Sequence, residues 1–133
     1  MADNKVFFDT NVLLYLLSEE DKANIAEALL TQGGVISVQV LNEFASVAIR
    51  KLKMPYGEIS EVLETVTMVC DVRNLTVETH RMALSVAQRY RFSFYDALIL
   101  SAAILANCDV LYSEDIQSGQ KINDQVMIYN PFE

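Results

Sequence analysis

Short apolar runs alternate with longer helical segments along this chain, and that alternation limits the folds open to it. Apolar runs of strand-forming type occupy residues 5–8, 35–36, 69–72, 110–112 and, as an edge strand, 126–129. Between them, apolar residues recur at helical spacing over residues 21–32, 38–52, 56–67, 77–90 and 94–107. Short strands that alternate with helices of about 10 to 15 residues indicate an α/β fold with a mainly parallel sheet.

Residues typical of helix ends stand between these segments. Gly33 and Gly34 follow the first helix, where a C-terminal glycine is common. Ser37, Thr76 and Ser93 each precede a helical segment, so their side-chain oxygens are expected to cap the helices that follow.

The composition is that of one globular domain, expected to cover residues 1–133. Apolar residues make up 52% of the chain and charged residues 21%, which predicts that apolar surface is covered by a partner or by a second copy of the chain. No apolar run approaches the roughly 18 residues of a membrane span, and the polar start at residues 1–5 lacks the apolar core of a signal peptide. A cytoplasmic protein without membrane attachment is therefore expected.

The two cysteines and the single histidine give no sign of a catalytic or zinc site. Cys70 and Cys108 lie in apolar sequence without a CxxC motif or a Cys/His cluster, so buried free thiols are expected. His80 has no serine or cysteine nucleophile motif around it and is expected on a helix surface.

The formal net charge of −8 argues against a protein that holds nucleic acid by bulk charge alone. It leaves open an enzyme whose acidic site is neutralised by metal ions while local basic residues bind phosphates. Solvated helix ends are an equal alternative for each of the candidate phosphate-binding residues, which are Arg50, Lys51, Lys53, Arg89 and Arg91.

Several carboxylates follow the expected strands or begin the helices between them. Asp9 directly follows the first strand, and Asp115 lies three residues beyond the fourth. In a parallel sheet both positions belong to the carboxyl edge, where α/β proteins bind ligands. Asp96, in the first turn of the most hydrophobic helix, lies at this edge if that helix leads into the fourth strand from the opposite direction. Glu43 lies near the start of its own helix, and hence near the same edge.

Each carboxylate also has a simpler interpretation. Asp9 could cap the following helix, and Ser93 with Asp96 resembles a capping box. Asp115 could be a solvated loop charge, and its neighbour Glu114 competes for its role. For Glu43, solvent exposure is the natural interpretation, because it belongs to a polar stripe made of Gln39, Asn42, Glu43, Ser46, Arg50 and Lys53.

The convergence of these carboxylates nevertheless predicts a metal site. Carboxylates that pack together repel one another, and some stay protonated unless a cation is present. Oxygen-rich acidic sites select Mg²⁺ or Mn²⁺, and such ions activate water and stabilise a phosphoryl transition state. The residues alone therefore predict a metal-dependent phosphodiester or phosphate hydrolase.

Four segments around these carboxylates resemble, in order, the motifs of PIN-domain ribonucleases. They are residues 6–15 (VFFDTNVLLY), 38–44 (VQVLNEF), 92–99 (FSFYDALI) and 111–119 (LYSEDIQSG). One such motif is a weak signal, whereas four in order over nearly the whole chain are specific. A compact chain of this kind most resembles the VapC toxins of bacterial and archaeal toxin–antitoxin pairs.

The resemblance implies a three-layer α/β/α sandwich and an endoribonuclease that depends on Mg²⁺ or Mn²⁺. The acidic catalytic residues of the family map onto Asp9, Glu43, Asp96 and Asp115. The three aspartates are expected to hold the metal, while Asn11 and Ser113 orient a carboxylate or the attacking water. The implied partners are an RNA substrate, a cognate antitoxin whose tail fills the groove beside the site, and a second copy of the chain in a homodimer.

Three other functions could also account for acidic residues at strand ends. A phosphoacceptor receiver domain needs an acidic pair after the first strand, an aspartate after a middle strand and a late lysine, and this chain lacks that pattern. A phosphatase with Asp9 as nucleophile favours a second aspartate where the chain has Asn11. A PIN-fold RNA-binding or regulatory module without cleavage activity remains the main alternative.

Overall fold

A six-stranded sheet runs through the molecule in the order β3-β2-β1-β4-β6-β5. The structure is a computed structural model that describes residues 4–133. Neighbouring strands pair in parallel except β5 with β6, which is antiparallel. The strands are β1 (Val6–Phe8), β2 (Gly34–Ser37), β3 (Cys70–Arg73), β4 (Val110–Tyr112), β5 (Lys121–Ile122) and β6 (Val126–Tyr129).

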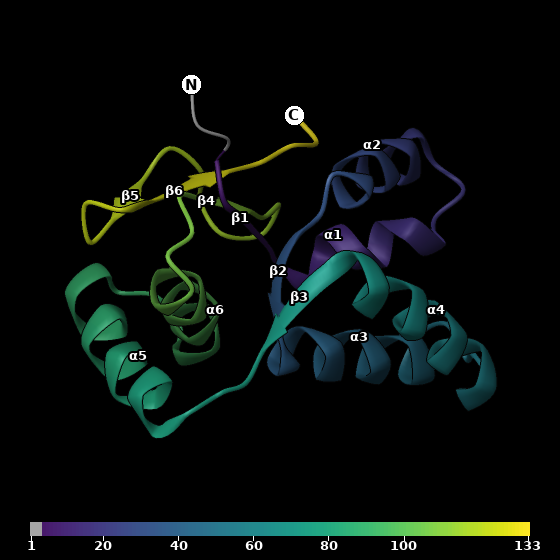
Figure 1. Ribbon diagram of the computed structural model, residues 1–133, viewed down its shortest axis with the longest axis horizontal. Helices are drawn as coiled ribbons and strands as arrows, with labels where there is room; N and C mark the ends of the chain where they lie inside the picture. Colours follow the sequence, from purple (N-terminus) through teal and green to yellow (C-terminus); the bar gives the residue numbers. More distant parts are fainter. Residues whose placement is uncertain (1–3) are drawn as a thin grey trace.

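Helices cover both faces of this sheet, which confirms the predicted three-layer α/β/α sandwich. Figure 1 shows α5 and α6 on one side of the strands and α1 to α4 on the other. The helices are α1 (Thr10–Leu14), the 3-10 helix η1 (Tyr15–Leu17), α2 (Asp21–Thr31), α3 (Val38–Arg50), α4 (Tyr56–Val69), α5 (Val77–Tyr90) and α6 (Phe94–Leu105).

The central strands are buried on both faces, as expected between two helical layers. Phe7 and Phe8 are consecutive residues that point to opposite faces of β1, and both are fully buried. Gly34 of β2 allows β1 to pack closely, since a Cβ atom there would lie 2.4 Å from Cε2 of Phe8. Gly33, with φ of +83°, ends α2 in the left-handed conformation that glycine adopts without strain.

Two expectations about the strands and caps were wrong in detail. The strand β6 is not at the edge, because β5 pairs with its outer side. Ser37 precedes α3, but its hydroxyl makes no capping bond. It is instead the last residue of β2, paired with Arg73 of β3 and fully buried. Thr76 and Ser93 do cap α5 and α6, as predicted.

The thiols and the histidine lie where the sequence predicts. Cys70 and Cys108 are buried and free, and burial raises the pKa of both thiols to about 11. His80 is exposed on α5, where its ring contacts the edge of Phe94 with a centroid distance of 5.6 Å. Of the helices in residues 4–133, none has the length and apolar character needed to cross a membrane.

The direction in which successive strands are added to the sheet reverses between β1 and β4. From β1 the chain moves to β2 and β3 on one side, and then returns to β4 on the other side. Such a switch point opens a crevice at the carboxyl ends of the two strands, here β1 and β4. The pairing of Phe8 with Tyr112 brings Asp9 beside Ser113, and the Asp9 N–H donates to the Tyr112 carbonyl at 3.0 Å.

Candidate functional site

A cleft of about 290 Å³ opens at the carboxyl edge of β1 and β4, and we call it the acidic cleft. All four carboxylates predicted from the sequence line it, namely Asp9, Glu43, Asp96 and Asp115. Asp9 begins α1, Glu43 lies on α3, Asp96 lies in the first turn of α6, and Asp115 lies in the loop after β4. Because α6 runs antiparallel to β4, its start reaches the same edge as the strand ends.

Asp9 is buried and accepts three hydrogen bonds. Its Oδ1 accepts from the Thr10 N–H at 2.7 Å, and its Oδ2 accepts from the Ser113 hydroxyl at 2.7 Å and the Asn11 amide at 3.3 Å. It is also the N-cap residue of α1. Capping and a place in the cleft are therefore compatible, and the same carboxylate does both.

The surroundings of Asp9 disfavour the ionised form of its side chain. Burial is the largest cause and raises its pKa from 3.8 to about 6, with the nearby charges of Glu43 and Asp115 adding to the increase. The hydrogen bonds from Ser113 and Thr10 act in the opposite direction because they stabilise the carboxylate. A cation in the cleft would reverse the balance and favour the ionised form.

Asn11 links Asp9 to the loop after β4. Its Nδ2 donates to Oδ2 of Asp115 at 3.2 Å as well as to Asp9, and its Oδ1 accepts from the Glu114 N–H at 3.1 Å. The neutral amide therefore contacts two of the predicted metal ligands. The orienting role that the family resemblance implies for Asn11 would use these two contacts.

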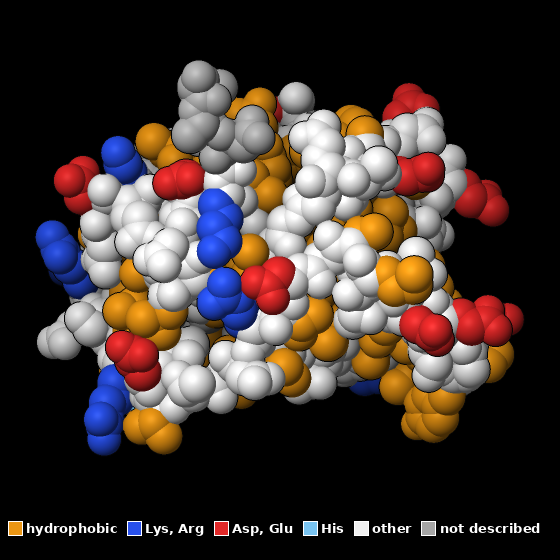
Figure 2. Space-filling view, viewed as in Figure 1, with side chains coloured by type: hydrophobic (Ala, Val, Ile, Leu, Met, Phe, Trp, Pro, Cys, Tyr) orange, Lys and Arg blue, Asp and Glu red, His pale blue; other side chains and the backbone are white. Residues whose placement is uncertain are grey.

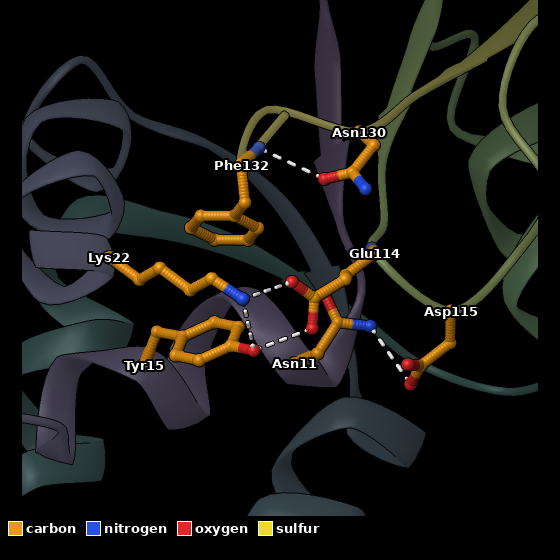
Figure 3. Close-up of polar contacts among 7 residues, drawn as sticks. All are labelled: Asn11, Tyr15, Lys22, Glu114, Asp115, Asn130 and Phe132. Atoms are coloured by element: carbon orange, nitrogen blue, oxygen red, sulfur yellow. Dashed lines mark hydrogen bonds and ion pairs between the residues drawn. The ribbon is translucent and has the colours of Figure 1, made fainter. Parts of the chain in front are cut away.

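The side chains of Glu114 and Asp115 point in different directions. The Glu114 carboxylate accepts from the Tyr15 hydroxyl at 2.5 Å and from Lys22 Nζ at 2.7 Å. Figure 3 shows it directed toward those two residues, while Asp115 faces the Asn11 amide. Asp115 therefore belongs to the acidic cleft and Glu114 does not.

Glu43 is not the solvent-exposed residue that its polar stripe suggested. Its Oε1 accepts from the Thr10 hydroxyl at 2.7 Å, and its side chain is only partly exposed. Ser46 and Arg50, from the same stripe of α3, also line the cleft. Half of the stripe, namely Glu43, Ser46 and Arg50, therefore lines an acidic cavity, a possibility that periodicity alone does not separate from exposure to bulk water.

Asp96 presents its carboxylate to the cleft while its backbone takes part in a cap. Its N–H donates to the Ser93 hydroxyl at 3.2 Å. The reciprocal bond of a capping box is absent among the described residues, which leaves the Asp96 side chain without a hydrogen-bond partner there. A carboxylate in this position is available to a ligand.

The cleft has the donor chemistry of a Mg²⁺ or Mn²⁺ site. Within residues 4–133, no three His, Cys, Asp or Glu side chains converge closely enough to hold one ion directly. Mg²⁺ keeps several waters and usually binds protein through only one or two carboxylates. An all-oxygen set around one cavity, with the pKa of Asp9 raised chiefly by burial, fits such a partly hydrated ion.

Two of the candidate phosphate-binding residues lie near the cleft carboxylates, and each lines a different cavity. Arg50 lines the acidic cleft itself. A second, polar groove of about 340 Å³ shares Asp96 and Asp115 with the cleft and is lined by Arg91. Lys51 lines a different, apolar groove, whereas Lys53 and Arg89 line none of these three.

The sequence did not indicate two residues, one in the acidic cleft and one in a cluster beside it. Thr10 stands between two predicted residues, and its hydroxyl orients Glu43. The sequence signal for Thr10 is a small hydroxyl residue directly after Asp9, within the first motif. Lys22 is the other, and its pairing with Glu114 across 92 positions leaves no local pattern in the sequence.

Known structures share this fold. A toxin–antitoxin complex from Klebsiella pneumoniae is 21% identical with a TM-score of 0.74, covering 97% of this chain and 99% of that chain. The Mycobacterium tuberculosis toxin VapC20, which cleaves the sarcin–ricin loop, is 18% identical with a TM-score of 0.68, covering 84% and 90%. VapBC2 from Rickettsia felis, bound to promoter DNA, is 20% identical with a TM-score of 0.68, covering 94% and 97%.

The sequence itself places the chain in a family. No curated protein matches it. The PIN domain matches residues 6–120, which hold all four acidic segments and most of the sheet. With the matching fold and the acidic cleft at its switch point, this chain belongs to the PIN-domain family.

Proposed function

We propose that this protein is a metal-dependent endoribonuclease that hydrolyses RNA phosphodiester bonds. The observation that supports this most is the gathering of four motif carboxylates around one cleft at the switch point of a PIN domain. A cavity of this kind suits a phosphate group only when a cation offsets its negative charge. That requirement agrees with the elevated pKa of Asp9.

In this proposal each polar residue of the cleft has one task. Asp9, Asp96 and Asp115 hold Mg²⁺ or Mn²⁺, which when bound polarises the scissile phosphate and lowers the pKa of water. Glu43, fixed by the Thr10 hydroxyl, orients the attacking water and accepts its proton. Asn11 and Ser113 keep the Asp9 and Asp115 carboxylates in place. In-line attack expels the ribose 3′-oxygen and leaves a 5′-phosphate.

The RNA substrate is proposed to pass the cleft carboxylates, running from the acidic cleft into the polar groove lined by Arg91. Arg50 on one side and Arg91 on the other would then contact the phosphates that flank the scissile bond. This arrangement supports binding of a single RNA strand by a chain whose net charge is −8. Such a substrate also agrees with the expected cytoplasmic location.

We further propose that the protein is the toxin of a toxin–antitoxin pair. An apolar groove of about 300 Å³ lies next to the acidic cleft and shares Asn11, Leu14 and Val47 with it. An antitoxin segment in this groove would block RNA from the cleft. The apolar share of the chain, 52%, suits a protein that also forms a homodimer.

RNA cleavage by the purified protein tests the central proposal. With Mg²⁺ or Mn²⁺ we expect cleavage that a chelator abolishes and that Asp9→Asn and Asp96→Asn each reduce by at least about 100-fold. Asp124→Asn serves as control, because Asp124 is exposed in a turn away from the cleft, with a φ of 55° that asparagine accepts. Undiminished activity in either cleft variant would overturn the assignment.

A PIN-fold RNA-binding module without cleavage activity is the second candidate. It is favoured by the observation that, over residues 4–133, three metal-ligating side chains do not converge on one point. The two functions differ in a single experiment, since such a module would bind RNA and Mn²⁺ yet leave the RNA intact. Intact RNA at saturating Mn²⁺, with binding detected, would favour it.

A further inference from the structure

A cluster outside the acidic cleft joins three distant parts of the chain. Lys22 of α2 donates to the Glu114 carboxylate at 2.7 Å and to the Tyr15 hydroxyl at 3.0 Å. Its ammonium lies 4.7 Å from the centre of the Tyr15 ring and 5.9 Å from that of Phe132. Figure 3 shows Lys22 between the two rings and Glu114. We call Tyr15, Lys22, Glu114 and Phe132 the Lys22 clasp.

The clasp is more than an ordinary surface ion pair. The described residues contain one other such pair, Arg73 with Asp71 at 2.8 Å, whose side chains are 42% and 57% exposed and only two residues apart. Lys22 and Glu114 are 35% and 27% exposed and 92 residues apart, and two aromatic rings flank the cation. Partial burial and several shared partners make such a network stronger than an isolated exposed pair.

Glu114 is held at both ends, and this determines where Asp115 points. Its carboxylate is bound by the clasp, while its backbone N–H donates to Asn11 Oδ1 at 3.1 Å. Asn11 Nδ2 in turn donates to Asp115 at 3.2 Å. With Glu114 fixed toward α2, the next residue is directed into the cleft. The clasp also removes a fifth negative charge from the vicinity of the four cleft carboxylates.

We infer that the Lys22 clasp positions Asp115 for metal binding by fixing the loop after β4. Lys22 and Glu114 are thus positioning residues that act through Asp115 and Asn11. This inference rests on the proposed function only in treating Asp115 as a metal ligand. Residues of this kind, one step removed from the ligands, commonly change metal affinity by about 10- to 100-fold when replaced.

Binding of Mn²⁺, followed by the electron paramagnetic resonance of the free ion, tests the inference without any RNA. We expect Lys22→Met and Glu114→Gln to weaken Mn²⁺ binding by about tenfold. The exchanged pair, Lys22→Glu with Glu114→Lys, should restore the affinity to within about threefold of the wild type, which a loss of general stability would not allow. Arg73→Met is the matched control, because it breaks the other ion pair, which lies on β3 and is separated from β4 by β2 and β1 in the sheet.

Hydrogen exchange supplies a readout that needs no metal. The Glu114 amide, which donates to Asn11, should exchange about tenfold faster in Lys22→Met than in the wild type or Arg73→Met. Wild-type Mn²⁺ affinity in Lys22→Met, or equal exchange of this amide in all three proteins, would overturn the inference. A protein that binds Mn²⁺ through an intact clasp but does not cleave RNA would contradict the proposed function and leave the clasp supported.

Discussion

Asp9 should make the stability of the metal-free protein increase as the pH falls. Its pKa is about 6 in the folded protein and about 3.9 in the unfolded chain, so between these values the folded state binds the extra proton. The free energy of unfolding should therefore rise by about 1 kcal/mol from about pH 7 to about pH 5. Urea unfolding in the presence of a chelator measures this change.

The control for this pH dependence is the variant Asp9→Asn, which has no titrating group at this position. It should lose the gain in stability on acidification. Excess Mg²⁺ should reverse the trend in the wild type, because a bound cation favours ionised Asp9. Stability that falls from about pH 7 to about pH 5 without metal would contradict the burial-driven shift.

Ser113 offers a second test at the same carboxylate. Its hydroxyl donates to Asp9 at 2.7 Å and lowers the pKa of that group, and it accepts from the Ile116 N–H at 3.1 Å. Ser113→Ala should raise the pKa of Asp9 further, move the acidic limb of the cleavage profile to higher pH, and cost about 1–2 kcal/mol of stability. A pH–rate profile measures the shift.

Ser101→Ala is the matched control for Ser113→Ala. Ser101 is equally buried, and its hydroxyl has no hydrogen-bond partner within the described residues. This substitution removes the same atoms without touching Asp9, so the pH profile should stay in place. Identical profiles for the two variants would show that Ser113 does not tune Asp9.

How far the site could be predicted depends on sequence distance. Asp9 and Asn11 lie within one short segment, and a strand end followed by polar residues indicates their shared role. Ser113 follows the neighbouring strand and meets Asp9 through the strand register. Lys22 could not be predicted, because its contact with Glu114 depends on how α2 packs beside the loop after β4.

At the scale of elements, the hydrophobic pattern located all the longer helices and five of the six strands, including β1 and β4, which carry the site. The strand β5 was missed because it has only two residues, too few for any alternation to show. The helix α1 and the 3-10 helix η1 contain an apolar run, residues 12–17, whose first two residues are buried and whose other four are partly buried. Such a run lacks the polar face on which helix predictions rely.

The cap of α6 can be tested as an element that positions Asp96. The Ser93 hydroxyl accepts from the Asp96 N–H at 3.2 Å and so orders the first turn. Ser93→Ala should cost about 1 kcal/mol of stability and reduce cleavage more than that loss explains, because Asp96 loses its fixed backbone. Thermal unfolding and cleavage at low temperature separate the two effects.

Ser37→Ala is the comparison for Ser93→Ala. Ser37 occupies the same position before α3, but its hydroxyl makes no capping bond and has no partner within the described residues. We expect a smaller loss of stability and unchanged cleavage. Equal effects of the two substitutions would mean that the Ser93 cap does not position Asp96.

Charge is distributed unevenly over the face of the molecule drawn in Figure 2. In Figure 2, Lys and Arg side chains gather over the half that carries α5, whereas Asp and Glu stand out along the edge formed by α2 and α4. The helix α4 carries Glu58, Glu61 and Glu64 and has no Lys or Arg. An RNA strand should therefore approach from the side of Arg91 and avoid the α4 edge.

The salt dependence of RNA binding tests this distribution. Two phosphate contacts, from Arg50 and Arg91, predict a slope of about −1.4 in a plot of log affinity against log salt concentration for a single strand, and removing one arginine should bring it to about −0.7. Fluorescence anisotropy of an unstructured RNA oligonucleotide with Asp9→Asn protein, which does not cleave, measures this slope.

Arg89→Gln is the control and should leave the slope unchanged, because Arg89 lines neither the cleft nor the polar groove. A steep slope that neither Arg50→Gln nor Arg91→Gln reduces would mean that RNA binds on another face, since electrostatic contacts elsewhere would then dominate the affinity.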